Sequence, residues 1–322
     1  MRRRQFISLL GTTLLAAIAA KARQVERTYR LGVLLPLTHD APVNVAFLAE
    51  FRRWGFIEGQ NLTIEERYAG FNNDLLPELA AGLLADGVEV IVTSASPAAV
   101  AAKQATQTVP IVFMEVNDPV GQGLVPNLAH PGGNVTGVST LSAGISGKRI
   151  ELLREALPDV HHIAILWYAA NPGMVSENSD MLAAASNAGL IAQSYGLTAP
   201  DDMAGMLAAA KRDGAEALVI LPSTPGDLQT IISFANNGRL PVLGSYRDFV
   251  VAGALMSFAP AYLDLRRRAA AYVDKILRGA RPGDLPVEQP QRFDVVLNLA
   301  TAGAMGITFP DPVLLQATEV IR

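Results

Sequence analysis

Cysteine is absent from this chain of 322 residues, which excludes disulfides, cysteine nucleophiles and thiolate metal ligands. Histidine is scarce as well, with four residues in all: His39, His130, His161 and His162. His161 and His162 are adjacent and would point to opposite faces of a strand, so they cannot share a metal ion there. We therefore expect no metal site.

Motifs of nucleotide binding and of hydrolysis are also missing. The sequence contains no Walker A loop, no G-x-S-x-G elbow and no H-E-x-x-H segment. Gly121-Gln122-Gly123 lacks the third glycine of a dinucleotide fingerprint, because Pro126 stands at that position. We expect no cofactor, and we find no nucleophile and base on which an enzyme could depend.

The sequence of the body of the chain reveals no concentrated basic face. The formal net charge is -4, although Arg2, Arg3, Arg4 and Lys21 are all basic and the first 22 residues contain no acidic side chain. The rest of the chain is therefore more acidic than the net charge suggests. Since phosphate binding needs a basic face, we expect no nucleic-acid partner.

The N-terminus has the three parts of an export signal. The basic residues 2–4 precede an apolar run of 15 residues, Phe6 to Ala20, and Ala20-Lys21-Ala22 is a small-x-small cleavage site. The run is shorter than the roughly 20 residues of a spanning helix, which favours cleavage over an uncleaved anchor. Residues 3–7 also fit the twin-arginine pattern, so both export routes stay open. Because no cysteine can carry a lipid, the sequence predicts a soluble periplasmic protein without residues 1–22.

Apolar runs of strand length alternate with helical patterns through the rest of the chain. With a hydrophobic content of 50%, this predicts an α/β fold of two Rossmann-like lobes, each a doubly wound parallel sheet. The predicted strands span 29–35, 62–68, 88–93, 111–115, 135–138, 161–168, 191–195, 217–221, 254–258 and 293–298. The predicted helices span 43–54, 73–85, 98–106, 120–128, 146–157, 174–188, 201–212, 262–277 and 312–321.

The strand and helix pattern restarts after the segment HPGGNVTG, as a second sheet would. We expect the chain to cross between lobes near residues 138, 258 and 286. The N-terminal lobe would then hold 28–138 and 258–285, and the C-terminal lobe 139–257 and 286–322. Three connectors act as a hinge rather than as one flexible tether, which favours closure of the lobes over a ligand.

A short pattern occurs twice and predicts that the two lobes are structural repeats. The stretch 86–118, which begins DGVEVIVTSASP, returns in shortened form as DGAEALVILPSTP (213–225) and PVLGSYRD (241–248). Each copy has a glycine turn, an apolar run, a hydroxyl-bearing loop and a proline; the alternative is that ordinary loop chemistry of α/β proteins occurs twice. The proline suits the first turn of a helix. These loops would lie at the carboxyl ends of parallel strands, where open α/β sheets bind ligands.

Small polar side chains after the predicted strands are the candidate ligand-binding residues. They are Ser94, Ser96, Asn117 and Asp118 on the first lobe, and Asn171, Ser223, Thr224, Tyr246 and Asp248 on the second. Hydroxyls and free backbone N–H groups at the start of a helix favour a carboxylate of the ligand. Asp118 or Asp248 could pair with an ammonium of the ligand, and Tyr246 could pack against its apolar tail. Capping of helices and turns is the alternative role for these side chains. Such a cleft orients a solute without reacting with it.

Three segments carry a resemblance to a known family. They are PIVFMEVNDPVGQGLVPNLAHPGGNVTGVS (110–139), ALMSFAPAYLDLRRRAAAYVDKILRGARPGDLPVEQP (254–290) and FDVVLNLATAGAMGITFP (293–310). Within them, the motifs NDPVG, HPGGNVTG and DLPVEQP occur in the same order and at similar spacing as in that family. Over nearly its whole length the chain resembles the ABC-transporter substrate-binding protein family related to the tryptophan- and tyrosine-uptake binding proteins.

The resemblance implies the type I periplasmic-binding-protein fold, with three crossovers, a ligand between the lobes and delivery to a membrane permease driven by a separate ATPase. The positions that match the family's ligand contacts are Ser94, Ser96, Asn117, Asp118, Asn171, Ser223 and Tyr246. The family's usual Met-Ser-Tyr-Gly is Met256-Ser257-Phe258-Ala259 here, and a lysine usual in an NLKTA-like segment is Ala300. The identity of the ligand therefore stays open.

Taken together, these features predict a monomeric periplasmic binding protein of an ABC importer, with a small amino-acid-like or aromatic carboxylate ligand in the cleft between lobes. Two alternatives stay open. One is a sensor that presents its ligand to a membrane receptor, which sequence cannot separate from transport. The other is a periplasmic enzyme on the same scaffold.

Overall fold

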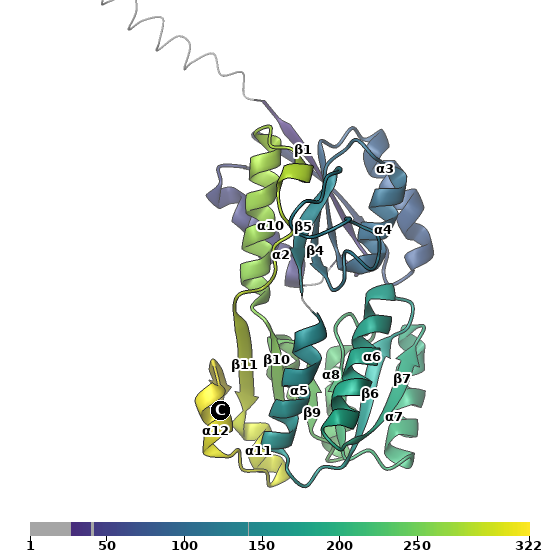
Figure 1. The fold of residues 1–322 in the computed structure, drawn as a ribbon, viewed down its shortest axis with the longest axis vertical. Helices are drawn as coiled ribbons and strands as arrows, with labels where there is room; N and C mark the ends of the chain where they lie inside the picture. The colour runs from purple at the N-terminus through teal and green to yellow at the C-terminus, as the bar shows by residue number, and fades with distance from the viewer. Residues whose placement is uncertain (1–26, 40–41, 141) are drawn as a thin grey trace, which may run out of the picture.

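The computed structural model describes residues 27–39, 42–140 and 142–322, so the predicted signal peptide lies outside the described residues. Two lobes are stacked along the longest axis of the molecule, and each has a central sheet with helices on both faces (Figure 1). The C-terminus lies on the second lobe. The predicted α/β architecture of two doubly wound lobes is confirmed.

The first lobe contains a five-stranded parallel sheet of order β2-β1-β3-β4-β5. Its strands are β1 (Tyr29–Leu35), β2 (Leu62–Tyr68), β3 (Val90–Ser94), β4 (Ile111–Val116) and β5 (Val135–Ser139). Its helices are α2 (Pro42–Arg53), η1 (Asn73–Leu75), α3 (Leu76–Ala85), α4 (Ala95–Ala105), α10 (Tyr262–Leu277) and η3 (Pro282–Asp284). Alternate residues of β1 serve two cores: Leu31 and Val33 pack with α2 and α10, whereas Leu34 packs with α3 and α4.

The second lobe contains a seven-stranded sheet of order β12-β11-β10-β9-β8-β6-β7, in which β10 and β11 run antiparallel. Its strands are β6 (His162–Tyr168), β7 (Ile191–Leu197), β8 (Ala217–Ile220), β9 (Val242–Gly244), β10 (Met256–Pro260), β11 (Phe293–Asn298) and β12 (Glu319–Ile321). The helices α5 (Ser142–Ala156), α6 (Pro172–Asn187), α11 (Leu299–Met305) and α12 (Asp311–Gln316) pack on one face. The helices α7 (Met203–Arg212), α8 (Leu228–Asn237) and α9 (Arg247–Val251) pack on the other, with η2 (Pro200–Asp202) ahead of α7.

Five strands of each sheet follow the same order, because β7-β6-β8-β9-β10 repeats β2-β1-β3-β4-β5. The strands β3 and β8 occupy equivalent places, and they are the strands of the repeated sequence pattern. The copies differ beyond the strand. In the first, Pro97 lies in the opening turn of α4, whereas in the second Pro225 lies in a loop and α8 begins at Leu228 with Asp227 as its N-cap.

One predicted helix is wrong, and the predicted C-terminal helix is too long. Residues 120–128 form turns, because the Gly121 N–H is bonded to Asp118 Oδ1 at 2.8 Å and Gly123 adopts a left-handed φ of 67°. At the C-terminus α12 ends at Gln316, and β12 then pairs in parallel with β11. In both segments tertiary pairing and turn bonds replace the local helical pattern.

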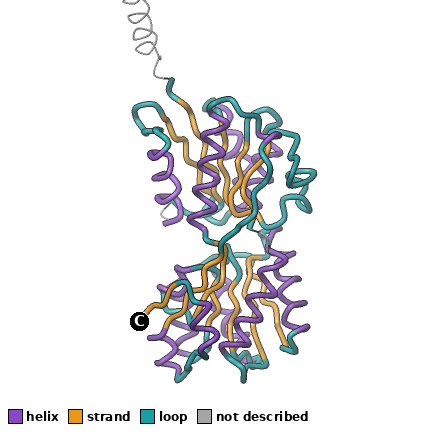
Figure 2. The backbone as a smooth tube through the Cα atoms, turned by 60° about the vertical axis from the view of Figure 1, so that its left-hand side comes forward, coloured by secondary structure: helices purple, strands orange, loops and turns teal. Residues whose placement is uncertain are grey.

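The chain passes between the lobes three times, and Figure 2 shows loop segments close together at the waist of the molecule. The passages lie between β5 and α5, between β10 and α10, and between η3 and β11. The third runs beside β5 before it crosses: the Ser139 N–H donates to Glu288 O at 2.8 Å, and the Glu288 N–H donates to Gly137 O at 3.0 Å. The third connector is therefore hydrogen-bonded to the strand from which the first connector leaves.

Candidate ligand-binding site

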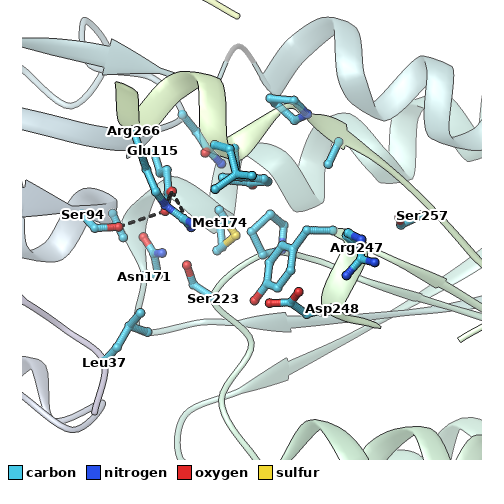
Figure 3. A pocket seen from close by; sticks show the side chains of 18 of the residues that line it. Leu37, Ser94, Glu115, Asn171, Met174, Ser223, Arg247, Asp248, Ser257 and Arg266 are labelled. Atoms are coloured by element: carbon cyan, nitrogen blue, oxygen red, sulfur yellow. Dashed lines mark hydrogen bonds and ion pairs between the residues drawn. The ribbon is translucent and has the colours of Figure 1, made fainter. Parts of the chain in front are cut away.

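A cavity of about 440 Å³ lies between the two lobes, beyond the carboxyl ends of β3, β4, β8 and β9 (Figure 3). The first lobe lines it with Leu37, Ser94, Ala95, Ser96, Glu115, Asn117, Tyr262, Leu263 and Arg266. The second lobe lines it with Asn171, Met174, Pro222, Ser223, Tyr246, Arg247, Asp248, Ser257, Ala259, Pro260 and Asp294. This is the edge at which open α/β sheets bind ligands.

The structure brings most of the predicted site residues to this cavity. Those that line it are Ser94, Ser96, Asn117, Asn171, Ser223, Tyr246 and Asp248. Asp118 and Thr224 do not line it. The Asp118 carboxylate accepts a hydrogen bond from the Gly121 N–H at 2.8 Å, and the Thr224 hydroxyl donates to Leu221 O at 2.7 Å. Both side chains stabilise their own loops.

The two asparagines at the cavity are engaged within the protein. Asn171 is the N-cap of α6 and accepts from the Gly173 N–H at 3.0 Å. Asn117 donates to Glu177 Oε2 at 2.5 Å, and its Oδ1 accepts from the Thr140 hydroxyl at 2.5 Å. No hydrogen bond engages the hydroxyls of Ser96, Ser223 and Ser257 among the described residues, so these three serines at the cavity have hydroxyls available to a ligand.

Several hydrogen bonds join the two lobes beside the cavity. Asn117 of the first lobe reaches Glu177 of the second, as above. The Asn73 amide donates to Ala170 O at 2.9 Å, and the Tyr168 hydroxyl donates to Phe71 O at 2.8 Å. The lobes therefore stand in direct contact around the cavity.

Backbone strain is concentrated at the cavity. Of the five non-glycine residues with positive φ in the described part of the chain, Ala95 (φ 61°), Glu115 (φ 59°) and Ser223 (φ 57°) all line it. Each such conformation costs on the order of 1 kcal/mol and persists where surrounding structure compensates for it. Such residues cluster at ligand sites, so the strained backbone makes this cavity the candidate site.

An ion pair that the sequence did not predict lies in the first-lobe wall. Arg266 of α10 reaches Glu115 of β4 with its Nη2 at 3.1 Å from Oε1, and the Ser94 hydroxyl donates to Oε2 at 3.0 Å (Figure 3). The available signal was a lone acidic residue inside the apolar run IVFMEV. Ser94, expected to meet a ligand carboxylate, instead gives its hydrogen to Glu115.

Two tyrosines from opposite lobes form an aromatic wall. The rings of Tyr246 and Tyr262 meet edge to face, with centroids 5.5 Å apart and planes at 76°. Burial raises the pKa of both phenols above 10.0, and the nearby Glu115 carboxylate raises the pKa of each further. Both phenols therefore stay neutral and can donate hydrogen bonds at neutral pH.

Acidic groups of the second lobe carry the uncompensated charge of the cavity. Arg247 is paired with Glu319, since Nε and Nη2 each lie 2.7 Å from a carboxylate oxygen. Asp248 and Asp294 have no ion pair or side-chain hydrogen bond among the described residues. Burial raises the pKa of the Asp294 carboxyl above its usual 3.8.

A buried charge network lies next to the cavity, at the junction of the lobes. Arg149 of α5 donates to Glu177 Oε1 at 2.5 Å and to Phe258 O at 3.0 Å, and both charged side chains are at most 3% exposed. Glu177 also holds Asn117 of the first lobe, as described above. The network therefore connects α5, α6 and β10 with the end of β4.

Comparison with known proteins identifies the chain's relatives. Residues 31–321 match the family model described as ABC transporter substrate binding protein. A tyrosine-binding protein of Clostridioides difficile is 24% identical over 80% of this chain and 75% of its own length. Within the described ranges, no helix has both the length and the apolar composition to cross a bilayer.

Two solved structures share the whole architecture. A conserved domain protein from Vibrio cholerae is 30% identical, with 91% of this chain and 100% of that chain covered and a TM-score of 0.84. An ABC domain in complex with L-Trp from Streptococcus pneumonia is 25% identical, with the same coverage of 91% and 100% and a TM-score of 0.84. The predicted type I periplasmic-binding-protein fold is confirmed by these and by more distant structures. The chain belongs to the family of ABC transporter substrate binding proteins.

Proposed function

We propose that the protein is the periplasmic substrate-binding component of an ABC importer and that it binds an aromatic amino acid between its lobes. The family supports the transport role. The names of two relatives, a tyrosine-binding protein and an L-Trp complex, support the ligand class. Residues 1–22 would be removed on export, and the closed protein would deliver its ligand unaltered to a membrane permease.

The charge balance of the cavity is the observation that carries the ligand class. Glu115 and Arg266 offset each other, and Arg247 is offset by Glu319. Among the described lining residues this leaves Asp248 and Asp294 as charges without an ion pair. Negative potential at a closed site favours a ligand with a cationic group over a simple aromatic carboxylate.

The distribution of groups over the two lobes suggests how an amino acid would lie. Its carboxylate would meet the first-lobe wall at Ser96 and the N-terminus of α4, where backbone N–H groups favour an anion. Its ammonium would meet Asp248 of the second lobe, and its aromatic ring would pack against Tyr246 and Tyr262. A cavity of about 440 Å³ is of the size that small-molecule ligands occupy.

Titration calorimetry with L-tryptophan, L-tyrosine, L-phenylalanine, tryptamine and indole-3-propionate tests the proposal. We expect an aromatic amino acid to bind most tightly, with a micromolar dissociation constant, or about -8 kcal/mol. Tryptamine, which keeps the ammonium, should bind more weakly. Indole-3-propionate should bind most weakly, because the acidic groups repel it. The ligand class would be overturned if none of these compounds gave heat or raised the unfolding temperature.

The export prediction has its own test. The mass of the protein recovered from the periplasm should correspond to a chain that starts at Arg23, after the small-x-small site. A full-length chain held in the membrane fraction would contradict it and would support an uncleaved anchor.

A further inference from the structure

Helix α10 carries three consecutive arginines, and the first of them turns into the cavity. Arg267 pairs with Glu50 at 3.2 Å and Arg268 pairs with Glu288 at 2.7 Å, outside the lining set. Arg266 instead has a side chain that is 11% exposed and lines the cavity beside β4 (Figure 3). Of these three arginines, Arg266 thus places a buried cation at the cavity.

The partner of Arg266 stands on a β-bulge. Pairing of β4 with β5 shifts between Met114 and Val116, and Glu115 between them adopts a left-handed φ of 59°. Regular alternation would place Glu115 on the side of Phe113, which packs with α3 and α4. The bulge puts Val116 on that side instead, and Glu115 reaches Arg266 on α10. Strained backbone is thus used to direct one carboxylate toward one guanidinium.

The hydrogen bonds of this pair leave one edge of the guanidinium available. Arg266 uses Nε and Nη2 on Glu115 Oε1, at 3.2 and 3.1 Å, and Oε2 is occupied by the Ser94 hydroxyl. Its Nη1 donates no hydrogen bond among the described residues. Because a guanidinium presents parallel N–H groups along each edge, the Nη1 and Nη2 edge matches a second carboxylate.

We propose that Arg266 binds the α-carboxylate of the ligand through this edge, and that Glu115 is a positioning residue that orients the guanidinium and offsets its charge. The proposal rests on the proposed function, since it assigns a partner to one end of an amino acid. The ring of Tyr262 lies 5.9 Å from Arg266 Cζ and restricts the guanidinium further. Anion recognition is then placed on the first lobe, opposite Asp248 of the second.

Paired ligands isolate the carboxylate contact. We compare L-tryptophan with tryptamine, which lacks the carboxylate, on the wild type and on Arg266→Gln. Loss of a charge-assisted contact should weaken L-tryptophan about 10- to 100-fold. Tryptamine should bind as well as before or more tightly, because Glu115 becomes an uncompensated anion. Arg267→Gln is the matched control on the same helix, and it should leave both affinities unchanged.

The double variant Glu115→Gln with Arg266→Gln separates two roles of Arg266: direct contact with the ligand carboxylate and neutralisation of Glu115. If Arg266 only neutralised Glu115, removal of both charges would restore L-tryptophan binding; we expect binding to stay weak. Glu115→Gln alone should tighten indole-3-propionate, because the Arg266 charge is no longer offset. A merely structural role for Glu115 would not produce that gain. If Arg266→Gln fails to fold, Arg266→Lys keeps the charge without the fork and should still weaken L-tryptophan selectively.

The possible outcomes distinguish failure of the Arg266 assignment from failure of the proposed function. Equal binding of L-tryptophan by the wild type and Arg266→Gln would overturn the assignment of Arg266 and leave the proposed function standing. Equal losses for both compounds would also overturn it, since the residue would then be structural. Failure of the wild type to bind L-tryptophan, L-tyrosine, L-phenylalanine or either analogue would remove the proposed function, and the assignment with it.

Discussion

Replacing Gly173 by alanine tests whether the contact between the lobes in this structure is the ligand-binding conformation. Gly173 lies in the first turn of α6, where the second lobe meets the first. A Cβ built on it would lie 2.5 Å from Ser96 Oγ and 3.3 Å from Gln122 Nε2, both of the first lobe. The added methyl group therefore opposes the approach of the lobes more than the folding of either one.

Gly173→Ala should have opposite effects on the free energies of the closed and open conformations. Overpacking costs about 1–3 kcal/mol, which corresponds to a loss of about 5- to 150-fold in ligand affinity if the closed form bears it. In a separated lobe, alanine favours the helix over glycine by up to about 1 kcal/mol. The unliganded Gly173→Ala protein should thus be as stable as the wild type or slightly more so, while its affinity falls.

Calorimetry with L-tryptophan measures the affinity, thermal unfolding measures the unliganded stability, and small-angle scattering measures closure through the radius of gyration. The Ser96→Ala variant removes the atom that the new methyl group would meet. Adding Gly173→Ala should therefore cost less affinity in the Ser96→Ala background than it costs in the wild type. Unchanged affinity of Gly173→Ala, or a parallel fall in unliganded stability, would refute the reasoning.

Three further changes test other parts of the structure. Glu177→Ala leaves the buried Arg149 without its carboxylate, and the free energy of unfolding in urea should fall by about 3–5 kcal/mol. Burial raises the pKa of Asp294, so the folded state binds a proton there more readily than the unfolded chain does. The protonated carboxyl therefore favours the folded state at low pH. That contribution to the free energy of unfolding is lost as pH rises from about 3.8 through the raised folded-state pKa. Asp294→Asn should therefore raise the free energy of unfolding at about pH 7 and have little effect near pH 3.5. Asp248→Asn should weaken L-tryptophan and tryptamine about tenfold in calorimetry and leave indole-3-propionate unchanged or tighter.

Strong periodicity in the sequence was enough to place many elements. The predicted ranges 29–35, 62–68, 262–277 and 293–298 coincide with β1, β2, α10 and β11. In α10 the buried Leu265, Ala269, Tyr272 and Val273 recur at helical spacing, so one face alone specifies the helix. The helix predicted for residues 120–128 was wrong because the Asp118 side chain accepts a hydrogen bond that closes a turn there. The spacing of apolar residues does not reveal such a bond.

The site was predictable in position but not in chemistry. Strand ends located Ser96, Ser223 and Asp248 at the cavity, because the carboxyl edge of a parallel sheet is fixed by topology. Glu115 and Arg266 were missed for a physical reason. Alternation assigns Glu115 to the wrong face unless the bulge is known, and its partner lies 151 residues away on a helix that returns from the other lobe.

The division of charge between the lobes has a consequence for closure. A ligand can shift the equilibrium between open and closed forms only by its difference in affinity for the two. Under the proposed assignments tryptamine would contact Asp248 on one lobe and indole-3-propionate would contact Arg266 on the other, so each would keep its main charged contact when the lobes separate. L-Tryptophan would contact both and would lose one contact on opening. Its binding should therefore close the protein to a degree that neither analogue reaches, even at saturation, and scattering at saturating concentrations of each compound measures that difference.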